Sequence, residues 1–594
     1  MRFKTIFILA MTLILPISFA MAHSANPSAA NAQALNKKIS KQVITLKNYL
    51  YKLYGPKGTE EKVFVGSEFC LACHQDKVGW KDTKHSMSLR KPMEQYSLVE
   101  GWGVIADYDQ NGVDDFRQGL NFNEISSGFD PFKPNAPILS VKNGQYTITI
   151  GEVDYPVVFI SGGLGQWRER YTVRIPAADS PTGYSKDVYF APIQYNVRTH
   201  QWIPYKTKLW YTEDHQPKFT NGMNLSDIAL KAKATFSKNC IGCHTTGIRS
   251  LGKWDDGEWR YTPYVAVLYS EDDSHYFDYD GDGIKDLVNV GCEDCHGPGS
   301  LHILGGGDPT KIINPAKLNV DDANAVCGHC HNRQRSVPNH TFNWPYHDDT
   351  DTQWYPGNGF PLSDFYANAN EFWPDGETSY EHNQHYAEFY RSNKPTNPYE
   401  PMRCFDCHDP HNRTNKHQIR KSLTIDGTVI NTKNENDTLC LACHAGYDDF
   451  ASLTKDMIAD YEDNINIIGP VVSAHTHHPY APDRIMGLSR CSLCHMPSVA
   501  NAQRASAHVA HTFKVVPPEK TLKYLEEGGM PNACAVSCHS KKVNLWGFGL
   551  DPDMLIWNED FDILTATKLM DYYGPDGIWW QIELESTHKN TTTK

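Results

Sequence analysis

The chain has 594 residues, of which 40% are hydrophobic and 21% charged, and its formal net charge is −14 at pH 7. This length predicts more than one domain, and the composition excludes a disordered or fibrous protein. The negative charge argues against a nucleic-acid partner held by a broad basic surface. The 16 cysteines and 27 histidines are the counts that point to a specific chemistry.

Residues 1–22 have the pattern of a cleaved signal peptide. Arg2 and Lys4 precede an apolar run that ends near Phe19, and small residues surround the expected cleavage point after Ala22. The apolar run is shorter than the ~20 residues that a membrane-spanning helix needs. We therefore expect export, no membrane span after cleavage, and a location in the periplasm or at the cell surface.

All 16 cysteines fall into eight motifs, numbered here 1 to 8 in chain order, in which a histidine directly follows the second cysteine. Seven motifs have two residues between the cysteines, and motif 8 has three. This pattern is typical of c-type haem attachment, in which both thiols form thioethers and the histidine binds the iron. The expected haem-binding cysteines are Cys70, Cys73, Cys240, Cys243, Cys292, Cys295, Cys327, Cys330, Cys404, Cys407, Cys440, Cys443, Cys491, Cys494, Cys534 and Cys538. The expected proximal iron ligands are His74, His244, His296, His331, His408, His444, His495 and His539.

Other uses of the cysteines fit this pattern less well. A zinc site pairs two Cys-x-x-Cys units but needs no histidine after each of them. Disulfide bonds impose no such spacing, and a redox dithiol needs a single motif. With eight haems, the porphyrins would supply much of the buried apolar area, so we expect the chain without haem to fail to fold.

Several further histidines are candidates for the distal face of each iron, although each could instead be an ordinary surface histidine. An iron with histidine on both faces passes electrons, whereas substrate chemistry needs an open position. Helices are expected at residues 80–88 and 381–390, where two groups of candidates lie. The candidates are His85, His302, His382, His385, His411, His477, His478 and His511, with His475 and His508 in the same clusters as the last three.

The haem motifs are unevenly spaced, and a long segment without cysteines separates motif 1 from motif 2. Within that segment, residues 145–150, 170–175 and 187–191 alternate in polarity or are rich in β-branched and aromatic residues, which predicts strands. We expect a mostly α and irregular multihaem cytochrome c fold with a β-rich insertion and a core built around eight covalent haems. The expected segments are a signal peptide (1–22), an N-terminal segment with the first haem site (23–99), the β-rich insertion (100–235), a multihaem core with seven sites (236–545) and a C-terminal packing segment (546–594).

Two acidic loops, 107–115 and 278–286, have the spacing of calcium-binding loops, with oxygen ligands at positions 1, 3, 5, 7 and 9 and a glycine for the bend. Neither has glutamate at position 12, so we do not expect a full EF-hand, and a solvated turn is the alternative. The expected ligands are Asp278, Asp280, Asp282, Ile284 and Asp286 in the second loop, and Asp107, Asp109, Asn111, Val113 and Asp115 in the looser first loop.

Six stretches of the chain resemble the multihaem cytochrome c superfamily that includes octahaem hydroxylamine oxidoreductase, octahaem tetrathionate reductase and cytochrome c nitrite reductase. These stretches are 291–302, 327–334, 404–411, 491–497, 511–518 and 530–539. The resemblance implies that the segment 382–394, which includes His382 and His385, supplies distal ligands from a helix. In relatives this helix tends to end in Ser-x-His, whereas here Asn393 and Lys394 follow Ser392. The difference marks either one unusual haem or a substitution by His385.

The leading expectation for function is electron transfer along a chain of packed haems, to redox partners or an extracellular acceptor. An alternative is an oxidoreductase that acts on nitrite, hydroxylamine, tetrathionate or sulfite at one five-coordinate haem. A further alternative is a subunit of a conductive cytochrome filament. No motif ends in lysine instead of histidine, which argues against the lysine-ligated catalytic haem of some relatives without excluding catalysis.

Overall fold

The computed structural model describes residues 29–55, 59–92, 106–162, 168–197, 199–231, 235–253, 259–269, 276–412, 415–484, 487–500, 509–540, 556–574 and 576–578. The predicted signal peptide lies outside these residues. The longest described helices are α1 (Ala29–Tyr54), α15 (Tyr461–Thr476) and α18 (Asp560–Tyr573). A search of the described ranges finds no helix with the length and apolar character needed to cross a membrane.

The other helices are short, and most of them carry or flank a cysteine motif. Glycine and proline are frequent between the motifs, and both residues interrupt helices, which keeps these elements short. These helices are α2 (Ser67–Leu71), α4 (Asp115–Gln118), α5 (Leu225–Lys231), α6 (Phe236–Asn239), α7 (Ile241–His244), α8 (Cys292–His296), α9 (Ser300–Leu304), α10 (Val320–Gly328), α11 (His385–Arg391), α12 (Cys404–Cys407), α13 (Thr438–His444), α14 (Lys455–Ala459), α16 (Cys491–His495) and α17 (Pro518–Lys523).

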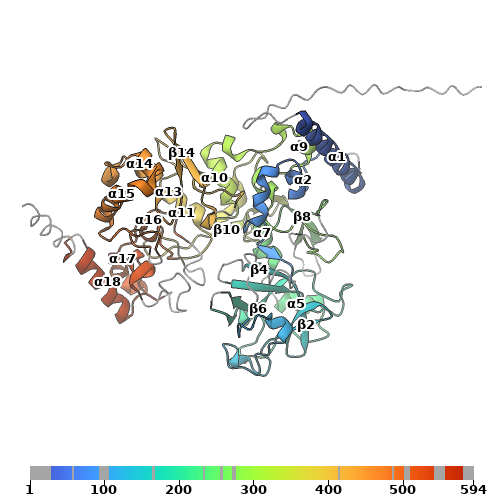
Figure 1. Ribbon diagram of the computed structural model, residues 1–594. Helices are drawn as coiled ribbons and strands as arrows, with labels where there is room; N and C mark the ends of the chain where they lie inside the picture. The colour runs from blue at the N-terminus through green and yellow to red at the C-terminus, as the bar shows by residue number, and fades with distance from the viewer. Residues whose placement is uncertain are drawn as a thin grey trace, which may run out of the picture.

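A seven-stranded antiparallel sheet forms one end of the molecule, at the lower right of Figure 1. Its strand order is β2-β3-β4-β5-β6-β7, and β1 pairs with β4. The strands are β1 (Leu89–Arg90), β2 (Ile138–Lys142), β3 (Gln145–Ile150), β4 (Val153–Gly162), β5 (Arg168–Val173), β6 (Tyr189–Asn196) and β7 (Gln201–Pro204). Strands β2 to β7 all lie within the segment for which a β-rich insertion is expected.

The expected strands differ from the observed ones mainly at their ends. The stretch 145–150 coincides with β3, whereas β5 begins two residues before the expected 170–175 stretch and ends two residues before its end. The stretch 187–191 only overlaps β6, which continues to Asn196. Pairing with neighbouring strands sets these limits, and a polarity pattern in one strand does not contain that information.

An aromatic core fills one face of the sheet. Phe116, Tyr171 and Trp202 are buried with ring centroids 5.1 to 6.1 Å apart. Trp202 donates its indole N–H to a carboxylate oxygen of Asp115 at 2.7 Å, so the polar edge of the ring is satisfied inside the core. This core gives the sheet region a hydrophobic interior that needs no haem.

The short strand β1 connects the segment of motif 1 to the sheet. Leu89 pairs with Ser161, and the guanidinium of Arg90 lies 2.9 Å from a carboxylate oxygen of Glu169 on β5. Both charged side chains are almost completely buried, with exposed fractions of 3% and 6%. Burial raises the pKa of Glu169 to about 7, against the opposing effect of the Arg90 charge. The pair is therefore a costly contact that depends on both partners.

Replacing Arg90 by methionine should lower the free energy of unfolding of the sheet region by about 3–5 kcal/mol, because the change leaves a buried carboxylate without its counter-charge. Hydrogen exchange at β4 and β5 measures the loss. The matched control is Lys142→Met, since Lys142 and Asp154 form an exposed pair at 2.6 Å that should contribute about 1 kcal/mol or less. Equal losses in the two variants would contradict the assignment.

A second hydrophobic cluster joins the sheet to motif 2. It contains Phe159 of β4, Phe236 of α6 and the fully buried Trp344, with Cys240 and Cys243 packed against it. The indole N–H of Trp344 donates to the Ser237 carbonyl at 3.0 Å. A Cβ atom at Gly242, inside motif 2, would meet the Trp344 ring at 2.4 Å, so only glycine allows this approach.

Four two-stranded sheets lie among the motifs, outside the large sheet. In each of them the two strands are antiparallel. They are β8 (Ile248–Lys253) with β9 (Trp259–Pro263), β10 (Gln334–Ser336) with β13 (Tyr366–Asn368), β11 (Tyr346–His347) with β12 (Thr352–Gln353), and β14 (Ser422–Ile425) with β15 (Thr428–Asn431).

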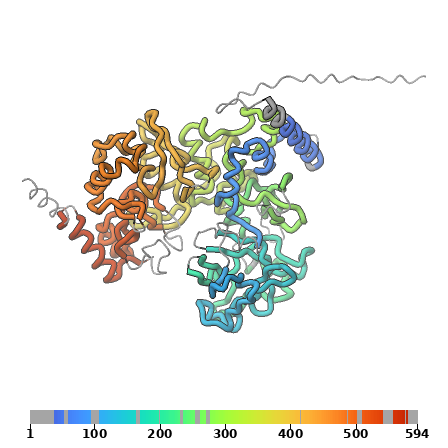
Figure 2. Tube along the Cα trace, in the orientation of Figure 1, coloured from blue at the N-terminus to red at the C-terminus, as the bar shows by residue number. Residues whose placement is uncertain are grey.

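Figure 1 shows the motif-bearing helices running from α2, near α1 and α9, and from α7, just above β4 of the sheet, to α13 and α16 on the opposite side of the molecule. The colours of Figure 2 follow the same course, from green through orange to red at the C-terminal end. Helix α18 packs against α17 and the turn that carries motif 8. Trp557, just before α18, is buried in a cluster with Val536 of that turn.

Candidate functional site

Each regular cysteine motif forms one turn of helix. In motifs 1, 4 and 5, the histidine N–H donates to the carbonyl of the first cysteine, as in His74 to Cys70 at 2.9 Å. Residues three and four apart share one face of a helix. Both thiols and the imidazole of a motif therefore lie on the same side, as two thioether bonds and an iron ligand on one porphyrin require.

Motif 8 adopts a different turn that accommodates its additional residue. Residues Ala535–His539 (η11) form a π-helical turn, which is wider than an α-helical one. The wider turn returns Cys538 and His539 to the side of Cys534 despite the longer spacing. The π-turn is therefore the local structure that lets the eighth motif present the same three groups as the other seven.

Four histidines that follow cysteine motifs face a second imidazole at a distance too long for ring stacking. Their ring centroids are 6.1 to 6.4 Å apart and their planes are within 14° to 29° of each other. An imidazole nitrogen lies about 2 Å from a metal that it binds, so two imidazoles on opposite sides of one metal have centroids roughly 6 Å apart. The pairs are His74 with His302, His296 with His411, His408 with His511, and His495 with His475.

A fifth pair has the same separation but a different orientation. The centroids of His85 and His331 are 6.2 Å apart, with their planes at 80°. The helix expected at 80–88 is not formed: a 3-10 helix, η2 (Gln75–Asp82), ends before His85. Among the described residues, no second imidazole faces His244, His444 or His539, either in the near-parallel arrangement of the first four pairs or in the near-perpendicular arrangement of the fifth.

Hydrogen bonds at Nδ1 prepare many of these imidazoles to bind a metal through Nε2. A backbone carbonyl accepts from Nδ1 of His296, His302 and His511 at 2.7 to 2.8 Å, and a carboxylate oxygen of Asp449 accepts from Nδ1 of His475 at 2.7 Å. A proton held at Nδ1 leaves the Nε2 lone pair available for a metal. The residues present therefore fit an iron porphyrin with histidine on both faces.

Burial favours the neutral form of three histidines near the motifs. It lowers the pKa of His85 and His244 to about 4 and that of His331 to about 3, and in each case nearby histidines add to the effect. Iron binds the neutral form of imidazole, so these environments favour the ligand form over the protonated one.

Thiols of different motifs lie next to each other, so the motifs are neighbours in space. In each of four pairs, a thiol–thiol hydrogen bond shifts the pKa of at least one member. For example, it is the main cause that raises the pKa of Cys70 and lowers that of Cys292. The four pairs are Cys70 with Cys292, Cys243 with Cys330, Cys327 with Cys404, and Cys440 with Cys491.

Hydrogen bonds other than those between thiols support the same four neighbour relations. The Cys292 N–H donates to the Ser67 hydroxyl at 3.1 Å, and the Cys404 N–H donates to the Asn324 side chain at 2.9 Å. The Cys491 N–H donates to the Asp437 carboxylate at 2.8 Å, and the Cys243 thiol donates to the His329 carbonyl at 3.8 Å. In each case a motif residue contacts the segment that carries a neighbouring motif.

Three further contacts link the remaining motifs. Motif 3 lies beside motif 4. Burial is the larger cause that raises the pKa of Cys295, the nearby Cys327 is the second, and helices α8 and α10, which carry these residues, are in contact. Motif 5 lies beside motif 6, since burial, with smaller effects of the nearby Cys440 and Cys443, raises the pKa of Cys407 to about 12. Between motifs 7 and 8, the Ser537 hydroxyl donates to the Leu493 carbonyl at 2.7 Å. The motifs thus form a spatial series 1-3-4-5-6-7-8, with motif 2 beside motif 4.

The other distal candidates are placed differently. His385 begins α11 and contacts the rings of His331 and His511 edge-on, at centroid distances of 5.3 and 4.9 Å. His478 stacks on Tyr573 at 5.3 Å, and His382 precedes α11. His477 ends α15 with a left-handed backbone conformation. Their assignment as ligands stays a prediction.

Of the expected cluster His475, His477 and His478, the residue that faces a proximal histidine is His475, opposite His495. It lies in the last turn of α15, on the same face as the buried Ile468 and Val472. The spacing i, i+4, i+7 is the signal that distinguishes this histidine from the two that follow the helix. His417 is a histidine that the sequence analysis did not single out, and its backbone carbonyl accepts the Nδ1 proton of His408 at 2.9 Å.

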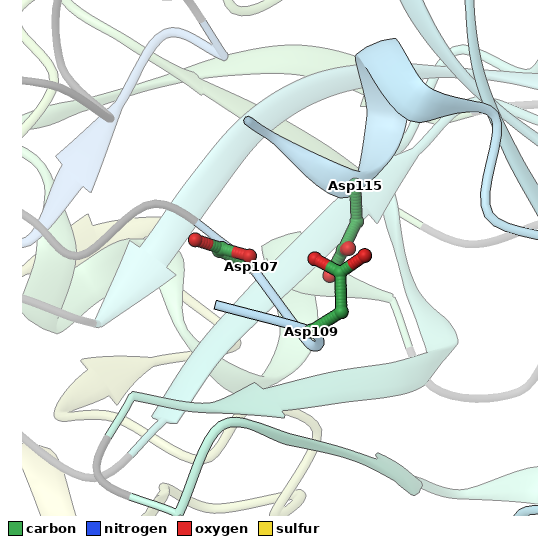
Figure 3. Close-up of side chains that lie close together, drawn as sticks. All are labelled: Asp107, Asp109 and Asp115. Atoms are coloured by element: carbon green, nitrogen blue, oxygen red, sulfur yellow. The ribbon is translucent and has the colours of Figure 1, made fainter. Parts of the chain in front are cut away.

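Both acidic loops bring three carboxylates together. Asp107, Asp109 and Asp115 converge from the loop and the start of α4 (Figure 3), with one oxygen of each within 4.8 Å of the others. Asn111 and Val113 instead take part in the turn, where the Val113 N–H donates to the Asn111 side chain at 2.8 Å. Both Asp115 oxygens accept hydrogen bonds, from the Tyr108 N–H and the Trp202 indole.

The second loop gathers Asp278, Asp280 and Asp286 in the same way. Asp282 accepts the Ile284 N–H at 2.8 Å and is not part of the converging group. The group thus contains positions 1, 3 and 9 of the expected ligand set.

Sequence comparison connects these motifs to known proteins. A family model described as a doubled CXXCH motif matches residues 397–449, which contain motifs 5 and 6. Over 160 residues the chain is 26% identical to the multiheme cytochrome MtrA of Shewanella baltica (strain OS185). The chain is a multihaem c-type cytochrome. Its cofactor is haem c, bound at Cys-x-x-Cys-His motifs.

The match to MtrA covers 27% of this cytochrome and 43% of the relative, so the cytochrome spans less than half the length of that protein. Among solved structures, the outer cell wall cytochrome OcwA superposes with a TM-score of 0.43 at 18% identity, over 80% of this chain and 83% of that one. An undecaheme cytochrome from the S-layer of Carboxydothermus ferrireducens gives a TM-score of 0.29 at 16% identity, over 76% of this chain and 52% of that one.

Proposed function

We propose that this cytochrome binds eight haems c covalently and passes electrons along them in the order of the motif series. The observation that carries the proposal is the unbroken set of contacts from motif 1 to motif 8. Haem supplies one-electron exchange at its iron when bound. Neighbouring thiols on separate motifs would place neighbouring porphyrins close together, so no motif is isolated from the others.

The histidine pairs support electron transfer as the role of these sites. With imidazoles on both faces, an iron has no open position for a substrate and undergoes little rearrangement when its charge changes. The chain contributes by holding Nδ1 protons on carbonyls and on Asp449, which fixes the orientation of the imidazoles. Motifs 1, 3, 4, 5 and 7 are the sites where such pairs occur.

The remaining parts of the proposal concern lineage and location. The six stretches from 291–302 to 530–539 support membership of the octahaem superfamily of hydroxylamine oxidoreductase, tetrathionate reductase and nitrite reductase. The start of the chain supports export through a cleaved signal peptide to the periplasm or cell surface. The partners would be redox proteins or an extracellular acceptor, because a chain of haems needs a donor and an acceptor for its electrons.

A second candidate function is oxidoreduction of a small nitrogen or sulfur oxyanion at motif 6. At this motif the pKa of His444 is lowered, mainly by burial and to a smaller extent by the positive charge of Lys394. Lys394 stands where the superfamily pattern leads to a histidine, and among the described residues no imidazole faces His444. A high-spin ferric signal in electron paramagnetic resonance that shifts on addition of nitrite, hydroxylamine or sulfite would favour this function, and its absence would remove it.

Coulometric reduction of the purified holoprotein tests the leading proposal. The expected result is uptake of eight electrons per chain, with all haems reduced through one entry point and without small mediators. Uptake confined to a subset of the haems, with the remainder reduced only when a mediator is added, would overturn the continuous series.

A further inference from the structure

Asp286 is a buried carboxylate that the protein satisfies only in part. Its exposed fraction is 1%, and Oδ2 accepts the Tyr279 N–H at 2.7 Å. Oδ1 is buried as well and has no hydrogen-bond partner. An oxygen of a charged group that is removed from water without a partner carries a large free-energy cost. This cost indicates that a group absent from the polypeptide itself completes the site.

The surroundings of Asp286 are those of a cation site. Asp278 and Asp280 each bring a carboxylate oxygen within 4.8 Å of one from Asp286. The Asp278 oxygens accept the N–H groups of Gly281 at 2.6 Å and Gly283 at 2.9 Å, which folds the loop around the group. The guanidinium of Arg249 lies 3.7 Å from a carboxylate oxygen of Asp280, and one arginine does not balance three converging carboxylates.

We propose that Asp278, Asp280 and Asp286, with the backbone oxygen of Ile284, bind a calcium ion. Calcium accepts six to eight oxygen ligands in flexible geometry, whereas magnesium demands a near-ideal octahedron and keeps most of its waters. The half-exposed Asp278 and the exposed Ile284 leave one side of the loop open to water, which would complete the coordination shell.

The position of the loop gives the ion a structural role. Tyr279, between two of the ligands, is buried in the cluster that also contains Phe159 of β4 and Phe236 of α6, and against which motif 2 packs. Its carbonyl accepts from Arg174 of the sheet region, and its hydroxyl lies 3.5 Å from a carboxylate oxygen of Asp187. An ion that fixes the loop therefore fixes the contact between the sheet and motif 2.

The first loop does not support the same inference. Both oxygens of its buried Asp115 have hydrogen-bond donors, so no carboxylate oxygen there lacks a partner in the way that Oδ1 of Asp286 does. Calcium at Asp107 and Asp109 stays a prediction from spacing. This difference makes the first loop a matched control for the second.

Calcium chloride titrated calorimetrically into chelator-treated holoprotein tests the site. Compared with the wild type, Asp286→Asn and Asp280→Asn should each lose one bound calcium ion per chain, or weaken that site at least tenfold. Asp109→Asn should leave the site unchanged. Chelation should also lower the temperature at which the contact between the sheet and motif 2 opens, measured by hydrogen exchange at β4 and α6.

Unchanged haem content and far-ultraviolet circular dichroism in each variant show that the chain is still folded. Calcium binding by Asp286→Asn and Asp280→Asn with wild-type stoichiometry and affinity would overturn the proposal. So would a wild-type holoprotein that binds no calcium outside the first loop, because residues 278–286 would then be a solvated turn only.

Discussion

Replacing Cys327 and Cys330 by serine should divide the electron path of this cytochrome in two. Motif 4 contacts motif 3 through Cys295, motif 5 through Cys404, and motif 2 through Cys243. Serine cannot form the thioether bonds, so the variant should lack this haem. With the protein tethered to an electrode by its C-terminal end, motifs 5 to 8 stay connected through thiol contacts, and only the pairing of His296 with His411 then links motif 3 to the segment of motif 5. Uptake within the time of wild-type reduction should therefore fall from eight electrons per chain to four.

The matched control removes a haem that lies outside the main series. In Cys240→Ser with Cys243→Ser, motif 2 is lost but the path from motif 8 to motif 1 is intact, so uptake should be seven electrons per chain. Haem content measured on the same samples separates a broken path from a misfolded chain. Seven electrons in both variants, with seven haems in each, would show that motif 4 is not a junction.

Replacing His302 by alanine should convert one iron from low-spin to high-spin. The imidazole of His302 faces that of His74 at 6.4 Å, and its Nδ1 proton is held by the Asp308 carbonyl at 2.8 Å. Without it, the iron at motif 1 would have an open position and a weaker ligand field. Electron paramagnetic resonance should show a new high-spin ferric signal that corresponds to one of the eight haems, with the other signals unchanged.

His215→Ala is the control for that substitution. His215 is exposed and lies beside Phe132 in the sheet region, 5.1 Å between ring centroids, so its loss should not alter any haem signal. A His302→Ala spectrum identical to that of the wild type would remove His302 as a ligand. The corresponding tests for the other pairs use His411, His475 and His511.

The chemistry of the haem sites follows from local spacing, which is why the sequence predicts it well. The thiols and the histidine of a motif are close in the chain, so one helical turn fixes their relation whatever the rest of the fold does. In motif 8, which has one more residue between its cysteines, the wider π-helical turn at Ala535–His539 fixes the relation of the thiols and the histidine locally as well.

The distal pairing and the order of the motifs could not be read from the sequence. His302 follows motif 3 but faces His74 of motif 1, and His411 follows motif 5 but faces His296 of motif 3. Such relations depend on how distant segments pack together. In the same way, Asp286 is distinguished from Asp282 by its burial, and the loop spacing alone gives both residues equal weight as ligands.

Intact-mass spectrometry of the purified protein tests the central claim most directly. The account predicts a polypeptide that begins after Ala22 and carries eight covalently attached haems, together with a strong Soret absorption band. A bare polypeptide, a zinc-loaded one, or one with haem missing from regular motifs would contradict it.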